Sequence, residues 1–251
     1  MVILRANNVS KTYNHSLIDK IHHEKANHVL KDIDLCVSAG ESISIMGKSG
    51  CGKTTLLKIL GTIDRATKGF VEYGGRDIRE YDDTAISRLR RKSIGFVFQD
   101  YNLFNNLTVE ENIMLPLVID KARHSDIKKK VLENAEFLNI SGILKKYPYE
   151  ISGGEKQRTA IARALVNDPQ VILADEPTGN LDSAATVSIM NYMADVNRIK
   201  KKALVIVTHD ALVASYCQKV IFIKDGRIEK MVESQKNKES IRHISDIMLN
   251  L

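Results

Sequence analysis

A glycine-rich loop constrains the fold of this chain more than any other feature. Residues 47–54 read Gly-Lys-Ser-Gly-Cys-Gly-Lys-Thr and lie between a short apolar run and a segment compatible with a helix. Glycines let successive backbone N–H groups curl around phosphate oxygens, and a helix that begins there adds its positive end. Lys53 would bring a cation to the outer phosphates, and the hydroxyl of Thr54 can face Mg²⁺. The pattern therefore predicts a nucleotide-binding α/β protein.

The composition is that of a globular chain. With 251 residues and 43% hydrophobic content, it can bury one large core, with or without a smaller attached subdomain. The longest aliphatic runs, at 171–174 and 204–207, are far too short to cross a bilayer, and the start Met1–Arg5 lacks the layout of a signal peptide. We therefore expect the chain to stay in the cytoplasm.

The cysteines suit a reducing compartment. Cys36, Cys51 and Cys217 are widely spaced and show neither metal-ligand spacing nor a pairing framework. This pattern predicts free thiols.

The charged and polar stretches are less specific. The net charge of +6 comes partly from lysine clusters at 128–130, 145–146 and 200–202. We expect these clusters to be solvated faces, with anionic lipid or nucleic acid as the alternative. The stretch 14–28 carries four histidines, but their spacing matches no strong ligand pattern and favours a solvated loop over a metal site.

Two kinds of apolar pattern predict two kinds of sheet. Segments 33–37 and 70–73 alternate apolar and polar residues, as half-exposed antiparallel strands do. Segments 171–174 and 204–207 are continuously aliphatic, as expected for parallel strands covered by helices on both faces. The parallel sheet should carry the phosphate loop.

Helical periodicity marks an insert and the end of the chain. Between segments 70–73 and 171–174, from about residue 103 to 166, apolar residues recur at three- and four-residue steps, for example at Ile127, Val131, Ala135 and Leu138. Residues 220–228 read as a hairpin, and a short apolar stripe follows them. We expect one domain at 1–230, with a helical subdomain inserted at about 100–166, and a helical extension at 231–251.

Two carboxylates follow the aliphatic run 171–174. At the carboxyl end of a parallel strand, Asp175 would bind Mg²⁺ directly or through water, and Glu176 would orient or deprotonate the attacking water. Taken alone, the pair is equally compatible with an acidic helix start. The phosphate loop upstream favours the catalytic interpretation.

Two further polar residues end apolar runs. His209 follows 204–207 and would reach the same edge of the sheet, where it can bond a phosphate oxygen and hold the Glu176 region. Gln99 follows 96–98 and offers both a donor and an acceptor to a metal or a water. Each residue alone would be uninformative.

The most selective element is the segment 151–158, Ile-Ser-Gly-Gly-Glu-Lys-Gln-Arg, which opens a helical pattern. Ser152 and Glu155 form a predicted capping box. The glycines Gly153 and Gly154 would also expose N–H groups and a positive helix end to a second phosphate-sized anion.

In this order, the motifs resemble those of the ATP-binding subunits of ABC transporters, from Val2 to about Glu229. The resemblance identifies the phosphate loop as Walker A, Gln99 as the Q-loop, 152–155 as the signature, 175–176 as Walker B, 179–182 as the D-loop and His209 as the switch histidine. Tyr13 lies where the family has an aromatic that stacks on adenine. The implied fold is an α/β P-loop NTPase of ABC type with a mostly parallel core sheet, an antiparallel β subdomain and an inserted α-helical subdomain.

The resemblance also implies the site. Catalysis would rest on Glu176, His209 and Gln99, and Mg²⁺ would be held by Thr54, Gln99 and Asp175. ATP would be bound by residues from several motifs: Tyr13, Gly47, Lys48, Ser49, Gly50, Cys51, Gly52, Lys53, Thr54, Thr55, Ser152, Gly153, Gly154 and Asp182.

The family also implies partners. Two copies would sandwich two ATP molecules head to tail, with Walker A of one copy facing the signature of the other. Hydrolysis would drive a separate membrane permease, which in such systems often works with a sensor histidine kinase, and the chain would lie on the inner face of the membrane. We expect no nucleic-acid partner, because the long heptad region of DNA-repair ABC proteins is missing and only one cassette is present.

Finer resemblance indicates a subgroup. Segments 98–103, 107–113, 147–150 and 174–182 are similar to the group of macrolide exporters, lipoprotein-releasing and cell-division ATPases and peptide-antibiotic transporters. Segments 214–226 and 244–248 look most like the bacitracin-resistance (Bce-type) subunits. Lipoprotein-releasing or cell-division subunits are the alternative, and a soluble ABC protein that acts on nucleic acid is a more distant one.

Three local expectations follow. Glu155 replaces the glutamine usual in the family and should cap its own helix, pointing away from the nucleotide. Cys51 replaces the usual serine, and the helix start with Lys53 should favour its thiolate. Tyr101, Leu103 and Phe104 would either form the floor of a groove for a permease helix or fill the subdomain core.

Overall fold

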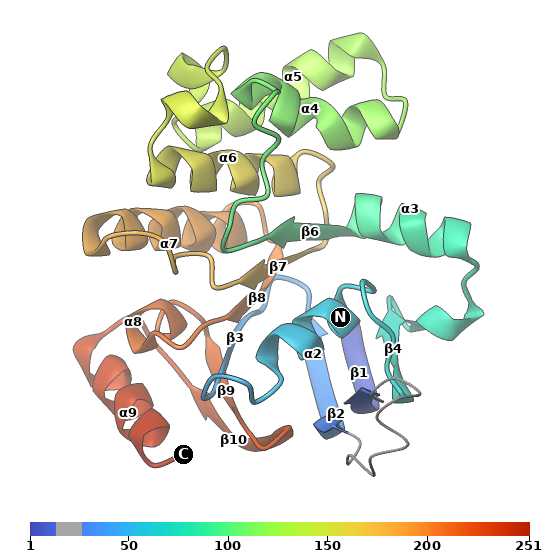
Figure 1. The fold of residues 1–251 in the computed structure, drawn as a ribbon, viewed down its shortest axis with the longest axis vertical. Helices are drawn as coiled ribbons and strands as arrows, with labels where there is room; N and C mark the ends of the chain where they lie inside the picture. Colours follow the sequence, from blue (N-terminus) through green and yellow to red (C-terminus); the bar gives the residue numbers. More distant parts are fainter. Residues whose placement is uncertain (14–26) are drawn as a thin grey trace, which may run out of the picture.

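The computed structural model describes residues 1–13 and 27–251 and contains two sheets (Figure 1). The predicted histidine-rich loop at 14–28 therefore lies outside the described residues, except for its last two positions. The strands are β1 (Val2–Tyr13), β2 (Asn27–Ser38), β3 (Ser42–Met46), β4 (Lys68–Tyr73), β5 (Arg76–Asp77), β6 (Ile94–Val97), β7 (Val171–Asp175), β8 (Ala203–Val207), β9 (Lys219–Lys224) and β10 (Arg227–Glu233).

The helices are α2 (Lys53–Leu60), α3 (Asp83–Ser93), α4 (Val109–Ile119), α5 (His124–Phe137), α6 (Gly153–Leu165), α7 (Ser183–Arg198), α8 (Ala211–Ala214) and α9 (Lys238–Leu249). Short 3₁₀ turns lie at Ile78–Glu80, Ser141–Ile143 and Pro148–Glu150.

The larger sheet has the order β10-β9-β3-β8-β7-β6 and is parallel except for β10. Its strands are continuously apolar because both faces are covered. In β8, Val205 and Val207 join the core under the antiparallel sheet, whereas Leu204 and Ile206 join the core under the helices. The predicted parallel sheet is confirmed, and it separates two hydrophobic cores.

The smaller sheet, β2-β1-β4-β5, is antiparallel. It packs against α2 and one face of the larger sheet, and alternate residues of β1 such as Leu4 and Ala6 are buried. The alternating segments at 33–37 and 70–73 form parts of β2 and β4, as predicted.

Helices α4, α5 and α6 form a layer at the top of the molecule in Figure 1, beyond α7 and the larger sheet. The chain leaves the sheet after β6 and returns at β7, so this layer occupies the stretch predicted to be a helical insert. Thr108 caps α4 through a complete capping box with Glu111. The exact division into domains stays a prediction.

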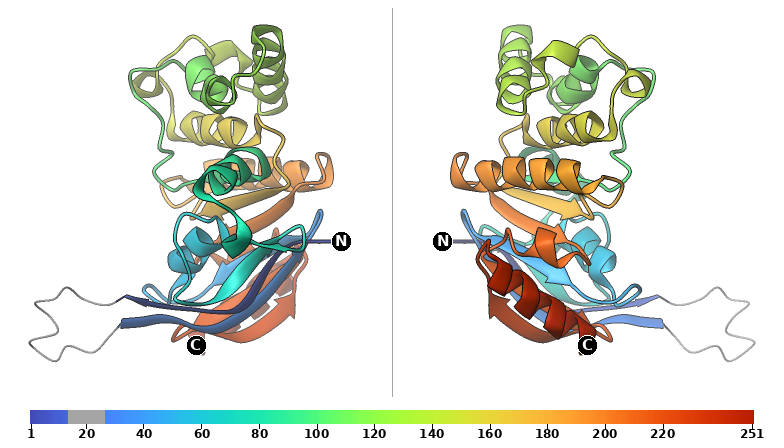
Figure 2. Two further views of the ribbon diagram at one scale, coloured as in Figure 1. Left: turned by 90° about the vertical axis from the view of Figure 1, so that its right-hand side faces the viewer. Right: turned by 90° about the vertical axis from the view of Figure 1, so that its left-hand side faces the viewer.

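The end of the chain forms the predicted hairpin of β9 and β10 and then α9. Strand β10 extends to Glu233, and α9 lies against α8 on the outside of the molecule (Figure 2). Ile244 is the buried centre of that contact. Within the described residues, no helix has the length and apolar character needed to span a membrane.

Candidate nucleotide-binding and hydrolysis site

The phosphate loop connects β3, buried along its whole length, to α2. Gly47 and Gly52 have φ values of 156° and 104°. A Cβ on Gly47 would lie 2.3 Å from the carbonyl oxygen of Ile223, and one on Gly52 would lie 2.8 Å from that of Val29. These two positions therefore require glycine, both for backbone conformation and for space.

Lys53 is buried at the start of α2 and turns back over the loop. Its ammonium donates to the carbonyl oxygens of Gly47, at 2.8 Å, and of Lys48, at 3.0 Å. The loop thus holds a cation at its centre, among the backbone N–H groups that would face phosphate oxygens.

The predicted metal residues meet at the edge of the sheet. The Thr54 hydroxyl donates to the Asp175 carboxylate over 3.1 Å, which joins the phosphate loop to the end of β7. Burial raises the pKa of the Asp175 carboxyl, although the hydrogen bond from Thr54 opposes this effect. A nearby cation would favour the charged form of the carboxylate. The described residues contain no group of three His, Cys, Asp or Glu side chains that could hold a metal. Mg²⁺ prefers hard oxygen ligands, often one or two from the protein with phosphates and water completing the set. The Thr54 hydroxyl and the Asp175 carboxylate therefore fit that ion.

Glu176 and His209 form the second pair at this edge. His209 Nδ1 lies 3.0 Å from Glu176 Oε1. Glu176 has a left-handed backbone, with φ of 46°, and its N–H donates to Val207 in the neighbouring strand β8 over 2.9 Å. The side chain of Glu176 is 18% exposed and that of His209 is 71% exposed, so the carboxylate is held in place beneath an accessible imidazole. An uncommon backbone conformation at such a residue is typical of a functional position.

Gln99 lies just beyond β6, next to β7 in the sheet, and contacts the 179–182 loop. Its amide donates to Asn180 Oδ1 over 3.4 Å, and Asn180 donates back to the Gln99 carbonyl over 3.1 Å. A Cβ on Gly179 would lie only 2.9 Å from Gln99 Nε2, so the missing side chain makes room for the amide. Gln99 is thus held against this loop, and its predicted contact with the metal stays a prediction.

Tyr13 is held by two residues that sequence reasoning missed. Its hydroxyl donates to Asp64 over 2.7 Å, and Lys11 also donates to Asp64, over 2.6 Å, with its ammonium 4.7 Å from the Tyr13 ring centre. Burial disfavours the charge of Asp64, but the bonds from Lys11 and Tyr13 hold its pKa below the usual value. The sequence could have indicated Lys11, because residues two apart lie on the same face of a strand, but nothing near Asp64 in the sequence links it to Tyr13.

The signature segment begins α6 with the predicted capping box. Ser152 Oγ accepts from the Glu155 N–H over 3.3 Å, and Glu155 accepts from the Ser152 N–H over 2.8 Å. This bond from the Ser152 backbone is the main reason that the pKa of Glu155 lies below its usual value. Glu155 is thus engaged in its own helix, as predicted, while Gly153 and Gly154 lie in the first turn.

Asp182 also acts as a helix cap. Its carboxylate accepts from the Ala185 N–H at the start of α7 over 2.8 Å. Its contact with nucleotide therefore stays a prediction, as do those of the other residues assigned to ATP.

The prediction for Cys51 was wrong. Burial raises the pKa of this thiol, and the Lys53 charge offsets the effect only in part. Cys51 packs against the core beneath the antiparallel sheet, which sequence spacing could not show. The thiol form is therefore favoured rather than the thiolate.

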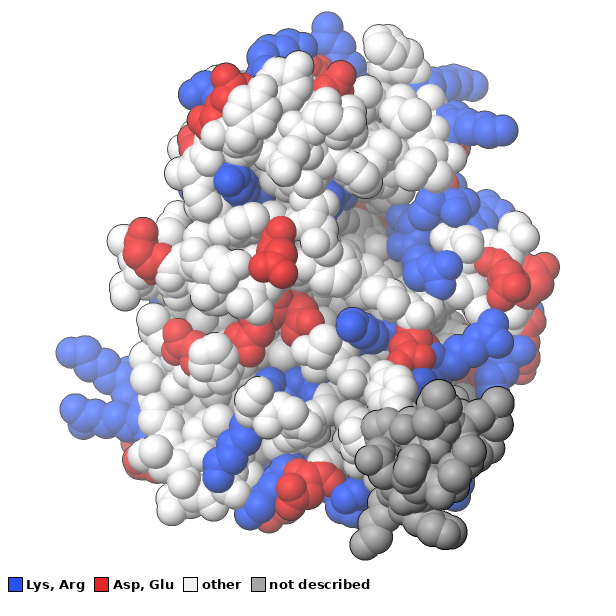
Figure 3. Space-filling view, in the orientation of Figure 1, with Lys and Arg blue, Asp and Glu red and all other residues white. Residues whose placement is uncertain are grey.

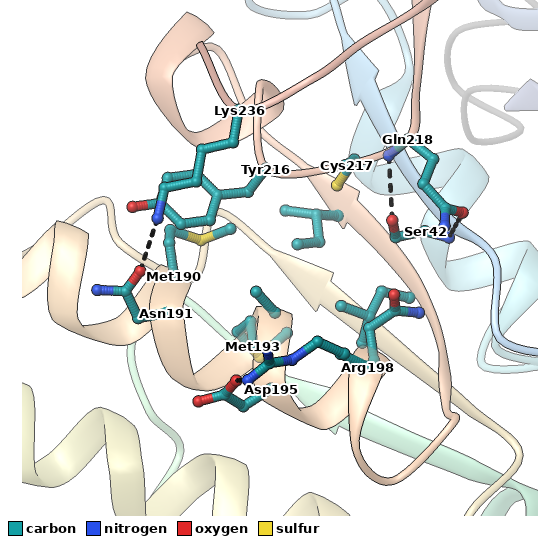
Figure 4. A pocket seen from close by; sticks show the side chains of 14 residues that line it. Ser42, Met190, Asn191, Met193, Asp195, Arg198, Tyr216, Cys217, Gln218 and Lys236 are labelled. Carbon is teal, nitrogen blue, oxygen red and sulfur yellow. Dashed lines mark hydrogen bonds and ion pairs between the residues drawn. The ribbon is translucent and has the colours of Figure 1, made fainter.

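A separate cavity of about 450 Å³ lies beside α7 and shares no residue with the phosphate loop. Met190, Cys217 and Lys236 line it, and Lys236 lies against Tyr216, with its ammonium 2.9 Å from Asn191 Oδ1 and 4.2 Å from the Tyr216 ring centre (Figure 4).

The fold and the site together define a P-loop ATPase cassette. The family model for ABC transporters matches residues 30–179. The bacitracin export ATP-binding protein BceA of Halalkalibacterium halodurans is 44% identical over 228 residues, which are 91% of this chain and 87% of that protein. The lipoprotein-releasing system ATP-binding protein LolD of Geobacter metallireducens is 45% identical over 200 residues, 80% of this chain and 89% of that protein.

A solved structure extends the comparison to three dimensions. The dimeric ATP-binding cassette of Methanocaldococcus jannaschii, in a post-hydrolysis state bound to ADP and Pi, matches with a TM-score of 0.82 and 37% identity over 92% of this chain and 98% of that chain. The chain belongs to the ABC transporter family, as a nucleotide-binding ATPase subunit.

Proposed function

We propose that this subunit hydrolyses Mg²⁺-bound ATP in a head-to-tail dimer and so powers a membrane permease that acts on antimicrobial peptides. The observation that carries the proposal is the joint position of the Thr54–Asp175 and Glu176–His209 pairs beside the phosphate loop. Strands β3, β8 and β7 are neighbours and run parallel, so the three segments that follow them meet at one edge.

The residues divide the chemistry of phosphoryl transfer to water. Lys53 and the loop N–H groups would neutralise charge on the outer phosphates. Glu176 would accept a hydrogen bond or proton from the attacking water, and His209 would hold that carboxylate in line with the γ-phosphate. Mg²⁺, when held by Thr54 and Asp175, would supply further charge neutralisation at the phosphates.

A second copy supplies the rest of the site. Ser152 to Gly154 begin α6, which belongs to the helical layer and follows no strand of the sheet edge. Their N–H groups would therefore face the ATP of the partner copy. The dimeric form of the Methanocaldococcus jannaschii cassette supports this arrangement.

A surface groove supports a membrane partner. A hollow of about 570 Å³ lies between α3, β6, α4 and α6, lined by apolar residues such as Phe96, Phe98 and Ile119 and by arginines. Lysine and arginine side chains gather over α3 on the right of the molecule in Figure 3. Phe104 does not line this hollow, but its side chain is 52% exposed, which favours the docking interpretation over core packing for this residue, whereas Tyr101 and Leu103 are half-buried. The chain would thus lie on the inner face of the membrane, bound to its permease.

The peptide-resistance role rests on the similarity to BceA. In such a system the permease would in turn work with a sensor histidine kinase. The similar identity to LolD keeps lipoprotein release as a second candidate.

Replacement of Glu176 by Gln tests the hydrolytic site. We expect ATP binding to persist, ATP-bound dimers to accumulate in size-exclusion chromatography and turnover to fall about 100-fold or more. The matched control is Glu155→Gln, which changes a carboxylate beside the other phosphate site, but glutamine also completes a capping box. Undiminished hydrolysis by Glu176→Gln would reject the assignment.

A further inference from the structure

The turn that follows Gln99 has an unusual backbone. Tyr101 and Asn102 are consecutive non-glycine residues with φ values of 61° and 48°. Side-chain-bearing residues rarely adopt this left-handed region, and two in succession persist only where surrounding contacts impose them. The contacts that impose this turn come from α6.

Arg163, near the end of α6, binds both residues of the turn. One guanidinium nitrogen donates to the Tyr101 carbonyl over 2.8 Å and the other to the Asn102 carbonyl over 2.5 Å. Among the described residues, no carboxylate forms an ion pair with Arg163, so its bonding is directed to these backbone oxygens. A planar guanidinium holds its N–H donors in a rigid fork and can bond two adjacent acceptors at once. A lysine ammonium carries its donors on one nitrogen and does this less well.

The same turn also contacts the beginning of α6. A Cβ added to Gly153 would lie 3.1 Å from the Tyr101 hydroxyl oxygen, so this hydroxyl packs against the first residue of the helix. The turn after Gln99 is therefore attached to α6 at two places about three helical turns apart. One attachment is a pair of hydrogen bonds, and the other is a close contact at the signature.

We propose that Arg163 is a positioning residue that fixes the Tyr101–Asn102 turn to α6, so that Gln99 and the signature glycines shift together. The proposal rests on the proposed ATP hydrolysis, in which Gln99 serves one ATP and the signature the ATP of the partner. Through Arg163, a change at Gln99 reaches the other nucleotide within the same chain.

The test compares four variants of the full-length chain. Arg163→Met removes the donors but keeps much of the side-chain volume, and Arg163→Lys keeps the charge without the fork. Arg163→Met with Asn102→Gly restores the left-handed preference of the turn, because glycine adopts positive φ freely. Arg198→Met is the matched control, since Arg198 lies on α7 and, within the part of the chain that the structure describes, forms an ion pair with Asp195 alone.

Two readouts separate positioning from folding. Amide hydrogen exchange of residues 99–104 should quicken in Arg163→Met and Arg163→Lys, and should remain unchanged in Arg198→Met. We expect kcat for ATP to fall about tenfold in Arg163→Met, the size typical for lost hydrogen bonds to a charged group, while KM changes less than about twofold. Adding Asn102→Gly should not restore kcat, because glycine restores the backbone preference of the turn but not its attachment to α6.

Three results would overturn the proposal. The first is unchanged exchange in Arg163→Met, and the second is a rise in KM without loss of kcat. The third is recovery of kcat on adding Asn102→Gly, because Arg163 would then only set the backbone conformation of the turn. If the parent chain itself does not hydrolyse ATP, the proposed function fails, whereas the exchange comparison still decides the role of Arg163.

Discussion

The three cysteines differ so much in environment that their alkylation rates test the structure directly. Cys36 is exposed, Cys51 is half-buried, and Cys217 is 2% exposed. Burial raises the pKa of Cys51 above its ordinary value and that of Cys217 to about 12. Because only the thiolate reacts, burial makes Cys51 less reactive than an ordinary cysteine at pH 7, and only about one in 10⁵ Cys217 side chains would be reactive.

The assay is alkylation by iodoacetamide between pH 7 and 9, followed by mass spectrometry of the labelled peptides. We expect Cys36 to react first, Cys51 more slowly and Cys217 only after unfolding. The rate at Cys51 should keep rising up to pH 9 without a plateau, because burial raises its pKa above the ordinary value.

Labelling of Cys51 should also inhibit ATP hydrolysis. Its sulfur would lie 2.6 Å from a Cβ on Gly47, so an added group must occupy the loop or the adjoining hollow of about 680 Å³ beside Lys48. Bound ATP should protect Cys51 but not Cys36. The control is Cys51→Ser, which should hydrolyse ATP and resist the reagent. The reasoning would be refuted if Cys51 reacted faster than Cys36 at pH 7 or reached a plateau below pH 8.

Two predictions concern Asp64 and Phe104. Asp64→Asn should raise the KM for ATP severalfold by freeing Tyr13. Because the folded pKa of Asp64 lies below its usual 3.8, the carboxylate stabilises the fold above that pH and loses the effect as pH falls through the folded value. The thermal midpoint of the parent should therefore fall more steeply below pH 4 than that of Asp64→Asn, and parallel curves would contradict this. Phe104→Asp should abolish co-purification with the permease without lowering the thermal midpoint. The control is Leu249→Asp at an 82% exposed position, and a large drop in the midpoint for Phe104→Asp alone would indicate core packing.

Much of the fold was predictable because its signals are local. The apolar runs of β7 and β8 identify strands covered on both faces, and the capping box at Ser152 fixes the start of α6. The phosphate loop could be recognised because glycine is required at fixed positions for backbone reasons. Such features depend on neighbours within a few residues.

What could not be predicted depends on contacts distant in sequence. Asp64 reaches Tyr13 because β1 and the loop before β4 meet in space. The pKa of Cys51 depends on the core that buries it, whereas sequence shows only the nearby Lys53. The left-handed turn at Tyr101 likewise depends on Arg163, which lies on α6, 62 residues further along the chain.

The length of helix α6 makes the contacts at its two ends sensitive to small tilts. Its 13 residues span about 20 Å, with the signature at one end and Arg163 near the other. A rotation of only about 5° about one end would move the far end by about 1.7 Å, more than the distance range over which a hydrogen bond remains good. A small tilt of the helix is therefore enough to break or make the hydrogen bonds at its far end.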